Sequence, residues 1–314
     1  MMLKRIPSPI LIPKPRDFGF QNTQAQPISL KLDRTYIVGV LNVTPDSFSD
    51  GNRFCKLSES IPHALEMIEQ GADIIDIGGE STRPGAKLLP LDVELKRVLP
   101  VIENLVRIRP SIIISIDTYK SQVAEAAIKA GARIVNDISG LGFAGSGNTV
   151  HFPPRSSGDS EMVDVVARYK VPLILMHING TPQMMQVNLT YKNLKYEMFD
   201  YFRKRINYAT KNGIQRSQII IDPGLGFGKR LEDNYKIIGW LEELHKLGQP
   251  IMLGPSRKSF IGNVLNLLPK DRLEGTAAVV ACAVFKGVQF IRVHDVREMK
   301  RVVVISATIK KYDR

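Results

Sequence analysis

The sequence of 314 residues has little cysteine and no long apolar run, and each shortage excludes a class of protein. Its two cysteines, Cys55 and Cys282, stand far apart and outside any CxxC or Cys/His spacing, so neither a disulfide framework nor a zinc site is predicted. The longest apolar stretch, Ala277 to Phe285, falls far short of the roughly 18 residues that span a bilayer. Ile10-Leu11-Ile12 is likewise too short for the apolar part of a secretory signal. We expect a cytoplasmic protein with no membrane partner.

The chain also lacks a strong charge over its central part. It has 43 Lys and Arg against 31 Asp and Glu, a formal net charge of +12. Residues 1–34 and 297–314 each carry a net charge of +4, which leaves only +4 for everything between them. A nucleic-acid-binding domain concentrates basic charge on its folded surface. This distribution therefore argues against a nucleic-acid partner.

Two regions are predicted from the pattern along the chain. Residues 1–34, which are rich in Pro and Gln and show no clear period, are expected to form an N-terminal extension. Residues 35–314 repeat a short apolar run, a polar turn, a helical pattern such as 121–130 or 275–286, and a glycine suited to end the helix. The eight apolar runs are 36–41, 74–77, 112–116, 133–135, 173–176, 219–221, 251–253 and 290–293. The glycines are Gly71, Gly131, Gly213, Gly248 and Gly287.

The apolar runs favour one fold class. Continuous apolar strands that alternate with helices are typical of a parallel sheet buried on both faces. Eight such units predict an α/β fold, a (β/α)8 TIM barrel in a single domain. Segments 71–76 and 131–136 are similar in sequence, as expected of repeated units. The rival, a doubly wound sheet, is disfavoured because no GxGxxG follows the first strand. Residues 141–160, half of them Gly, Pro or Ser, are predicted to form a long loop on the catalytic face.

Polar residues gather where the predicted strands end, which is the functional face of such a barrel. Each signal alone has an ordinary explanation. Asp222 suits a helix cap, and the glycines of 224–228 suit a tight turn without the GxxxxGK spacing of a phosphate loop. Residues 256–258 suit a solvated helix start, and His294 a structural role. All eight strand ends would face one pocket, however, and carboxylates, amides and cations together suit a polar heterocycle with an anionic group.

Four segments resemble the signature segments of the dihydropteroate synthase family of pterin-binding enzymes. They are 42–51, 78–85, 222–229 and Ser256-Arg257-Lys258, and the likeness runs from about residue 30 to residue 310. The resemblance implies a (β/α)8 barrel, a homodimer and a target of sulfonamides. It also implies a reaction of folate biosynthesis, in which 7,8-dihydropterin-6-ylmethyl diphosphate condenses with 4-aminobenzoate, with Mg²⁺ as cofactor, to give 7,8-dihydropteroate and diphosphate.

The same resemblance assigns residues to the pterin. It implies that the Asp222 carboxylate accepts two parallel N–H groups of the pterin ring in a bidentate contact. The remaining pterin-binding residues are implied to be Asp117, Asn136, Met176 and Lys258. The catalytic residues are implied to be Asp117, Lys258 and Arg83.

Further residues are implied for the other two groups that react. For the diphosphate they are Asn42, Thr82, Arg83, Arg292 and His294; for 4-aminobenzoate they are Pro84, Phe227 and Ser256. Asn42 is also the implied Mg²⁺ ligand. An amide oxygen suits this metal, which keeps most of its waters and takes few protein ligands.

Two alternatives remain at this point. A corrinoid-type methyltransferase would share the barrel and the pterin pocket, but it has no use for the diphosphate contacts at 82–83 and 292–294. A non-catalytic pterin-binding paralogue, or a phosphate-handling barrel of another specificity, is the second alternative. Release of diphosphate from the pterin substrate in the presence of 4-aminobenzoate would separate all of these readings.

Overall fold

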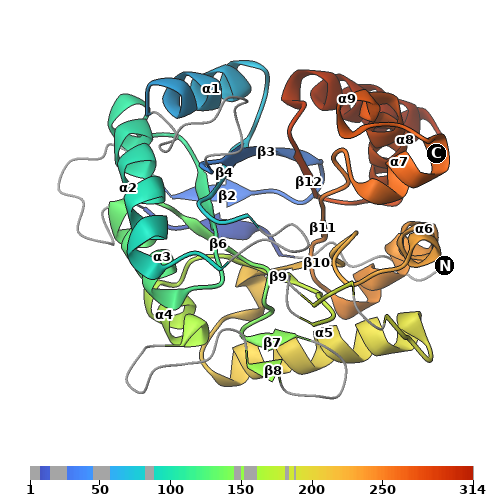
Figure 1. The fold of residues 1–314 in the computed structure, drawn as a ribbon, viewed down its shortest axis with the longest axis horizontal. Helices are drawn as coiled ribbons and strands as arrows, with labels where there is room; N and C mark the ends of the chain where they lie inside the picture. The colour runs from blue at the N-terminus through green and yellow to red at the C-terminus, as the bar shows by residue number, and fades with distance from the viewer. Residues whose placement is uncertain are drawn as a thin grey trace.

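The computed structural model describes residues 8–14, 27–44, 57–81, 88–144, 150–151, 161–180, 184–186 and 189–313. At its centre stands an eight-stranded sheet surrounded by helices (Figure 1). In chain order the strands are β3 (Tyr36–Asn42), β4 (Ile74–Gly78), β5 (Ile114–Asp117), β6 (Ile134–Asp137), β9 (Leu173–Met176), β10 (Ile219–Asp222), β11 (Met252–Leu253) and β12 (Phe290–Val293). Their spatial order is β10-β9-β6-β5-β4-β3-β12-β11, and every neighbouring pair is parallel.

The two edges of this sheet meet and close it into a barrel. Ile221 on β10 forms a parallel bridge with Ile251, just before β11. The backbone N–H of Ile221 donates to the carbonyl oxygen of Pro250 at 2.9 Å. The predicted (β/α)8 barrel is therefore confirmed, and each of the eight apolar runs holds one of its strands. The run at 112–116 pairs only from Ile114, and the run at 133–135 extends to Asp137.

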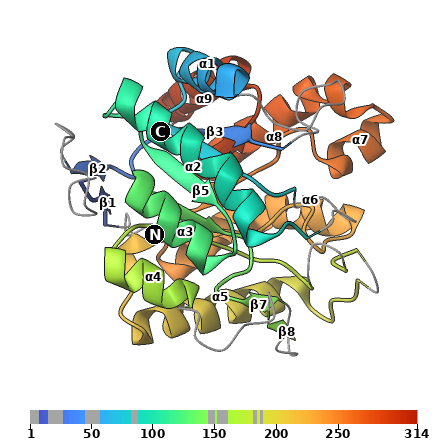
Figure 2. The ribbon, with the colours of Figure 1, turned by 60° about the vertical axis from the view of Figure 1, so that its left-hand side comes forward.

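Helices cover the outside of the barrel (Figure 2). The described α-helices are α1 (Leu57–Glu69), α2 (Leu91–Ile108), α3 (Ser121–Ala130), α4 (Met162–Tyr169), α5 (Leu194–Lys211), α6 (Leu231–Trp240), α7 (Ser259–Leu265), α8 (Leu273–Phe285) and α9 (Val296–Tyr312). Short 3-10 helices are η2 (Arg216–Gln218), η3 (Leu241–Leu247) and η4 (Pro269–Asp271). The helices predicted at 121–130 and 275–286 are confirmed as α3 and α8. All five predicted helix-ending glycines have positive φ, as Gly131 does at 116° directly after α3.

The outward side chains of the strands form the main core with the helices. Ile75, Ile77, Ile114 and Ile116 are completely buried in this cluster, and helix residues such as Val98 pack on them. Because strand side chains alternate between two faces, the intervening residues point into the barrel. The apolar runs thus supply two cores, one outside the barrel and one within it.

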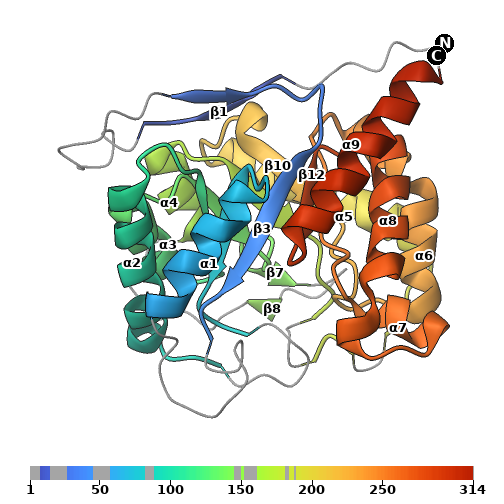
Figure 3. The ribbon, with the colours of Figure 1, turned by 90° about the horizontal axis from the view of Figure 1, so that it is seen from above.

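The N-terminal extension contributes to the inner core, which its composition did not predict. β1 (Ile10–Ile12) and β2 (Ile28–Leu30) pair antiparallel, and Figure 3 shows this hairpin across the end where β3 begins. Ile10 and Ile12 are completely buried against residues of all eight barrel units, Ile74 and Phe290 among them. The Nε of Arg133, directly before β6, donates to the carbonyl oxygen of Pro13 at 2.8 Å. The hairpin therefore closes the amino end of the barrel. The domain boundary at residue 34 stays a prediction.

Within 141–160, the expected long loop holds a short hairpin. β7 (Phe143–Ala144) and β8 (Val150–His151) pair antiparallel on the side of the barrel opposite the β1–β2 hairpin (Figure 3). Residues 145–149 and 152–160 lie outside the described part of the chain. Among the described helices, none combines the length and the apolar character that a membrane crossing requires.

Ile12→Ala should destabilise the protein by about 2–5 kcal/mol, because it leaves a cavity in a fully buried site. Leu11→Ala, one residue away on the same strand, is the control, since Leu11 is 60% exposed and its truncation should change stability by less than about 0.5 kcal/mol. Urea unfolding measures both variants. Equal losses of stability in the two variants would show that the contribution of β1 to stability does not come from its buried face.

Candidate active site

Inside the barrel, the side chains change from apolar to polar toward the carboxyl ends of the strands. Ile74 and Ile220 belong to the buried cluster above the hairpin, and two residues further along their strands stand Asp76 and Asp222. The same step leads from Ile134 to Asn136 and from Phe290 to Arg292. Residues two apart on a strand point the same way. On these four strands the inner face therefore becomes polar at the mouth formed by the strand ends.

Arg292 holds two of these polar groups together. Its Nε donates to Asp76 Oδ2 and its Nη2 donates to Asp117 Oδ2, both at 2.6 Å. Asn136 Nδ2 adds a hydrogen bond of 3.0 Å to Asp76 Oδ2. Burial raises the pKa of Asp117; the Arg292 guanidinium opposes this rise and the Asp76 carboxylate adds to it. One guanidinium thus serves two buried carboxylates, and the group keeps a net negative charge when both are ionised.

Three neighbouring strands also present buried polar atoms without a hydrogen-bond partner. These atoms are Asp76 Oδ1, Ser115 Oγ and Asn136 Oδ1. Asp76 pairs with Ser115 across β4 and β5, and Asn136 lies on the next strand, β6. Buried polar atoms are nearly always hydrogen-bonded in folded proteins, and leaving them unpaired costs about 1–3 kcal/mol each. A ligand with several N–H donors would satisfy these acceptors.

Asp222 ends β10 and faces the same mouth. Its Oδ1 accepts a hydrogen bond of 2.7 Å from the backbone N–H of Gly224. Gly224 has φ of +65°, and a Cβ there would lie 2.1 Å from the carbonyl oxygen of His177, so only glycine fits. Burial raises the pKa of Asp222, and the nearby Lys258 ammonium opposes the rise. A carboxylate held in this way gains from any further donor that binds it.

The turn after Asp222 is held by a lysine. Lys229 is only 4% exposed, and its Nζ donates to the carbonyl oxygens of His177, Gly224 and Phe227 at 3.2, 3.1 and 2.7 Å. These acceptors match the three N–H donors of an ammonium group. Burial lowers the pKa of Lys229 to about 7, which the Asp222 carboxylate opposes. This residue therefore shapes the turn that carries Phe227.

Lys258 approaches from the start of α7. Its Nζ donates to the carbonyl oxygen of Leu225 and lies 4.4 Å from the centre of the Phe227 ring. Such a distance allows a cation–π contact. Burial lowers the pKa of Lys258 to about 8, and the Asp222 carboxylate opposes that shift. The lysine thus joins the Asp222 turn to the end of β11.

The ends of β11 and β12 are joined by a hydroxyl and an ion pair. Ser256 Oγ accepts a hydrogen bond of 3.2 Å from the His294 backbone N–H and lies 3.0 Å from His294 Nδ1. Arg257 Nε donates to Asp295 Oδ2 at 2.8 Å, and its Nη2 pairs with the other carboxylate oxygen. These contacts fix Ser256, which is two residues before Lys258, against His294, which is two residues after Arg292.

The described residues fit a magnesium ion of the kind predicted. β3, β4 and β5 place Asn42, Gly78 and Asp117 side by side in register. A Cβ built on Gly78 would lie 3.6 Å from Asp117 Oδ2 and 3.8 Å from Asn42 Oδ1, so both oxygens border the space that this glycine leaves. Among the described residues, no three His, Cys, Asp or Glu side chains gather as a complete metal site. Few protein oxygens are what Mg²⁺ takes when phosphate oxygens and water complete its shell.

The structure brings ten of the predicted site residues to the strand ends or to the turns that follow them. They are Asn42, Asp117, Asn136, Met176, Asp222, Phe227, Ser256, Lys258, Arg292 and His294. Thr82, Arg83 and Pro84 lie outside the described part of the chain. The roles that the resemblance assigned to all of these residues stay predictions.

Two side chains of the site were not singled out from the sequence. Asp76 stands inside an apolar run, and that interruption at an inward position was the available signal. Lys229 follows a glycine-rich turn, where an exposed lysine is the ordinary expectation, and nothing local indicates its burial.

Comparison with known proteins agrees with the site. A family model described as "Pterin binding enzyme" matches residues 38–294. The dihydropteroate synthase of Synechocystis sp. is 46% identical over 270 residues, which are 86% of this chain and 88% of that protein. The chain belongs to the dihydropteroate synthase family. The resemblance to this family that was inferred from four segments of the sequence is thereby confirmed.

Solved structures of the dihydropteroate synthase family are similar along most of the chain. The crystal structure of the Yersinia pestis synthase with a sulfonamide drug complex has a TM-score of 0.82 and 37% identity, covering 92% of this chain and 98% of that one. The Xanthomonas albilineans synthase with 4-aminobenzoic acid has a TM-score of 0.78 and 37% identity, covering 90% and 95%. These relatives support the synthase and not the corrinoid methyltransferase.

Asp222→Asn should weaken binding of a phosphate-free pterin by about 1–3 kcal/mol, because an amide nitrogen then faces a ring N–H in a buried site. Isothermal titration calorimetry measures the affinity. Asp92→Asn on α2 is the control, since its carboxylate is 66% exposed and pairs with Lys96 on the surface. Unchanged affinity in Asp222→Asn would contradict the predicted contact.

Pterin affinity should also fall as the pH rises through about 8, because Lys258 loses its proton there and with it a charged donor beside the ring site. The arginine in Lys258→Arg should stay charged over the whole range, because a guanidinium loses its proton only above about pH 12. Calorimetric titrations between about pH 6 and pH 10 compare the two proteins. Titration of the ligand affects both equally, so identical slopes would show that Lys258 is not the group responsible.

Proposed function

We propose that this chain condenses 7,8-dihydropterin-6-ylmethyl diphosphate with 4-aminobenzoate to give 7,8-dihydropteroate and diphosphate, a step of folate biosynthesis. The observation that carries the proposal is the mouth of the barrel. Unpartnered acceptors on β4 and β6 and the Asp222 carboxylate on β10 all lie toward the carboxyl ends of their strands, and Lys258 and Arg292 supply positive charge there. This arrangement suits a heterocycle rich in N–H groups that also carries an anion.

Asp222 and Asn136 would bind the pterin ring. The amidine edge of a pterin offers two parallel N–H donors, and a carboxylate accepts both in one plane. Asp222 still has acceptor positions besides the one that Gly224 uses. Asn136 Oδ1 is buried and unpartnered, so a ring N–H would complete it. Met176, buried beside Ile138 and Ile178 and next to Phe227, gives the ring an apolar surface.

The reaction exchanges one bond at the methylene group of the pterin. The nitrogen lone pair of 4-aminobenzoate forms the new C–N bond, the C–O bond to diphosphate breaks, and diphosphate leaves with that electron pair. The amine nitrogen loses one proton, which passes to water or to the departing diphosphate. Positive charge develops on the pterin, and the carboxylates of Asp117 and Asp76 stabilise it at short range in a site of low dielectric. No covalent intermediate on the protein is required.

The leaving diphosphate needs positive charge and N–H donors. Arg83, Arg292 and His294 are proposed to supply them, with Thr82 as a further contact. Asn42, with Asp117 beside it, would hold Mg²⁺, which when bound supplies positive charge that stabilises the departing diphosphate. We propose that 4-aminobenzoate lies between Phe227 and Pro84 with its carboxylate near Ser256, and that sulfonamides occupy the same place.

The proposed assembly is a homodimer. Large apolar side chains are exposed on α7 to α9 and on the chain between them, which is typical of a surface that meets a partner. They include Val264, Leu265, Leu268, Phe285, Ile305 and Ile309. The cytoplasmic location expected from the sequence stays a prediction.

One assay tests the proposed function directly. Purified protein is mixed with the pterin diphosphate, 4-aminobenzoate and Mg²⁺, and both diphosphate and the pteroate product are measured. Stoichiometric formation of the two is expected. Diphosphate release without pteroate would indicate a hydrolase, and pterin binding without either product would indicate a non-catalytic paralogue.

4-Aminobenzoate should bind tightly only when diphosphate and Mg²⁺ are present. Thr82 and Arg83 directly precede Pro84, so contacts that fix the first two for the diphosphate also fix one wall of the aminobenzoate site. Such coupling typically amounts to about 1–3 kcal/mol. Calorimetric titration with diphosphate and Mg²⁺, with diphosphate alone, and with neither measures it. Equal affinity in all three conditions would contradict an ordered mechanism.

A further inference from the structure

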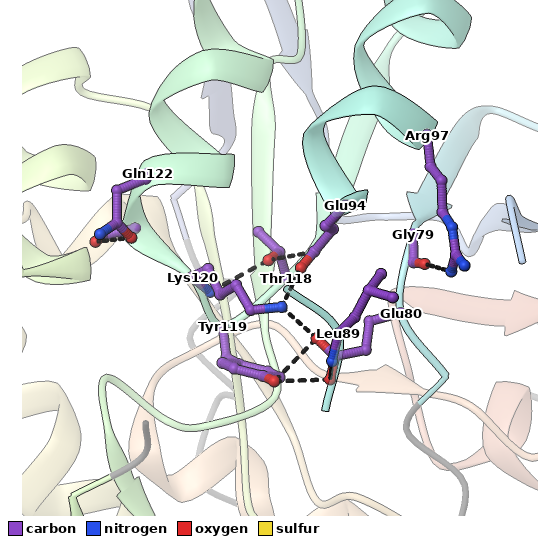
Figure 4. A network of polar contacts seen from close by, with 10 residues as sticks. Gly79, Glu80, Leu89, Glu94, Arg97, Thr118, Tyr119, Lys120 and Gln122 are labelled. Atoms are coloured by element: carbon purple, nitrogen blue, oxygen red, sulfur yellow. Dashed lines mark hydrogen bonds and ion pairs between the residues drawn. The ribbon is translucent and has the colours of Figure 1, made fainter. Parts of the chain in front are cut away.

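A cluster of buried charges lies beside the site and is used by none of the steps above (Figure 4). It consists of Glu80, Glu94, Thr118, Tyr119 and Lys120, and we call it the Glu80 cluster. Glu80 follows β4, Glu94 lies in the first turn of α2, and the other three form the turn between β5 and α3. The side chains of Glu80, Glu94 and Lys120 are 7%, 1% and 12% exposed. The cluster therefore joins three segments of the chain through side chains that are nearly inaccessible to solvent.

Glu80 contacts Tyr119 and Lys120 in the turn after β5, and Leu89 outside the cluster. Tyr119 Oη lies 2.8 and 2.9 Å from its two carboxylate oxygens, and Lys120 Nζ donates to Oε2 at 2.5 Å. The backbone N–H of Leu89 donates to Oε1 at 3.1 Å. In Figure 4 the Glu80 carboxylate faces Tyr119 and Lys120, and Leu89 lies next to it. The Glu80 carboxylate thus links Leu89, which lies nine residues further along the chain, to the Tyr119–Lys120 turn.

Lys120 and Glu94 keep that carboxylate in place. Lys120 Nζ contacts Glu94 Oε2 at 2.5 Å as well, and Thr118 Oγ1 donates to Glu94 Oε1 at 2.7 Å. Burial raises the pKa of Glu94, and Lys120 opposes the rise. Buried ion pairs add little to stability in general, because removing the charges from water offsets their attraction. What such a cluster does supply is a defined geometry.

The segment that the cluster bears on is 81–88, whose residues 82–87 lie outside the described part of the chain. Glu80 and Leu89 flank this segment, which contains Thr82, Arg83 and Pro84. Arg97 on α2 contacts the backbone just before Glu80, since its Nη1 donates to the Gly79 carbonyl oxygen at 2.8 Å (Figure 4). A Cβ on Gly79 would lie 2.8 Å from Val98 Cγ1, so the backbone there is packed directly against α2. Asp117, a partner of Arg292, directly precedes Thr118 of the cluster.

We propose that Glu80 is a positioning residue, which ties Leu89 to the turn after β5 and so governs binding of the substrates that are assigned to Thr82, Arg83 and Pro84. The proposal rests on the proposed function and extends it. Glu80 itself touches no substrate. Its effect should therefore be confined to the substrates assigned to Thr82, Arg83 and Pro84, and binding of the pterin ring, assigned to Asp222 and Asn136, should be independent of it.

The test compares four variants of the full chain. Glu80→Ala removes every contact of the carboxylate. Glu80→Gln keeps an oxygen for the Leu89 N–H but loses the ion pair with Lys120. Tyr119→Phe removes one hydroxyl and leaves the remaining contacts, so it is the variant least able to disturb folding. Glu103→Gln, on the exposed face of α2, makes the same change of charge away from the cluster and is the control.

Three readings are taken: KM for each substrate, the dissociation constant of a phosphate-free pterin, and hydrogen exchange of the peptide that contains Leu89. We expect the KM values for 4-aminobenzoate and the pterin diphosphate to rise about tenfold or more in Glu80→Ala. Smaller rises should follow in Glu80→Gln and Tyr119→Phe, and none in Glu103→Gln. Pterin affinity should stay unchanged in all four, and exchange at Leu89 should increase in Glu80→Ala.

Two outcomes would overturn the proposal. Unchanged KM values in both Glu80→Ala and Tyr119→Phe would show that the segment does not depend on Glu80. Parallel losses of pterin affinity, KM and unfolding midpoint would show that the cluster only stabilises the fold. Absence of product with the unaltered protein would instead contradict the proposed function, so the two failures are distinguishable.

Discussion

The contact of Arg292 with Asp76 and Asp117 is the interaction on which the rest of the site depends. Asp76 is completely buried, and an unpaired carboxylate in that place would be strongly destabilising. The guanidinium serves both acids from β12, on the far side of β3 from them, and so fixes three strand ends relative to one another. Because two carboxylates share one cation, the pair retains acceptor capacity and negative charge. That excess suits a ligand that offers N–H groups and becomes positive as it reacts.

The β1–β2 hairpin makes this charge arrangement effective. Ile10 and Ile12 close the amino end of the barrel, and an apolar layer that includes Ile220 separates the hairpin from the polar mouth. This layer keeps water from reaching the site through the amino end of the barrel. The charges at the mouth therefore interact in a medium of low dielectric. The raised pKa of Asp222 and the lowered pKa of Lys258 have the same origin, since burial is the main cause of both. The extension thus lies on the far side of the apolar layer from the site.

Most of the barrel could be predicted from the sequence, because its strands are continuous apolar runs and its helices end in glycine. The hairpin could not, since β1 and β2 are three residues each and are stabilised by contacts with strands far along the chain. At the site, Asp222 and Arg292 were singled out because they stand at the ends of predicted strands, and Asp222 also begins a segment that resembles the family. Lys229 was missed because its burial depends on carbonyl groups that the fold, not its neighbours in sequence, brings together.

The site therefore combines two kinds of support. Strand ends hold Asp117, Asn136 and Asp222 through the hydrogen bonds of the sheet itself, so these groups are fixed as soon as the barrel closes. Segments that leave the strands lack such a ladder and need side chains to fix them. Lys229 does this for the turn after β10, and Arg257 ties the end of β11 to Asp295. Beyond β4, Glu80 binds the backbone N–H of Leu89 in the same way. In each case a charged side chain is bound to backbone or to an opposite charge, because only a strong, directional contact defines a loop that buries little apolar surface.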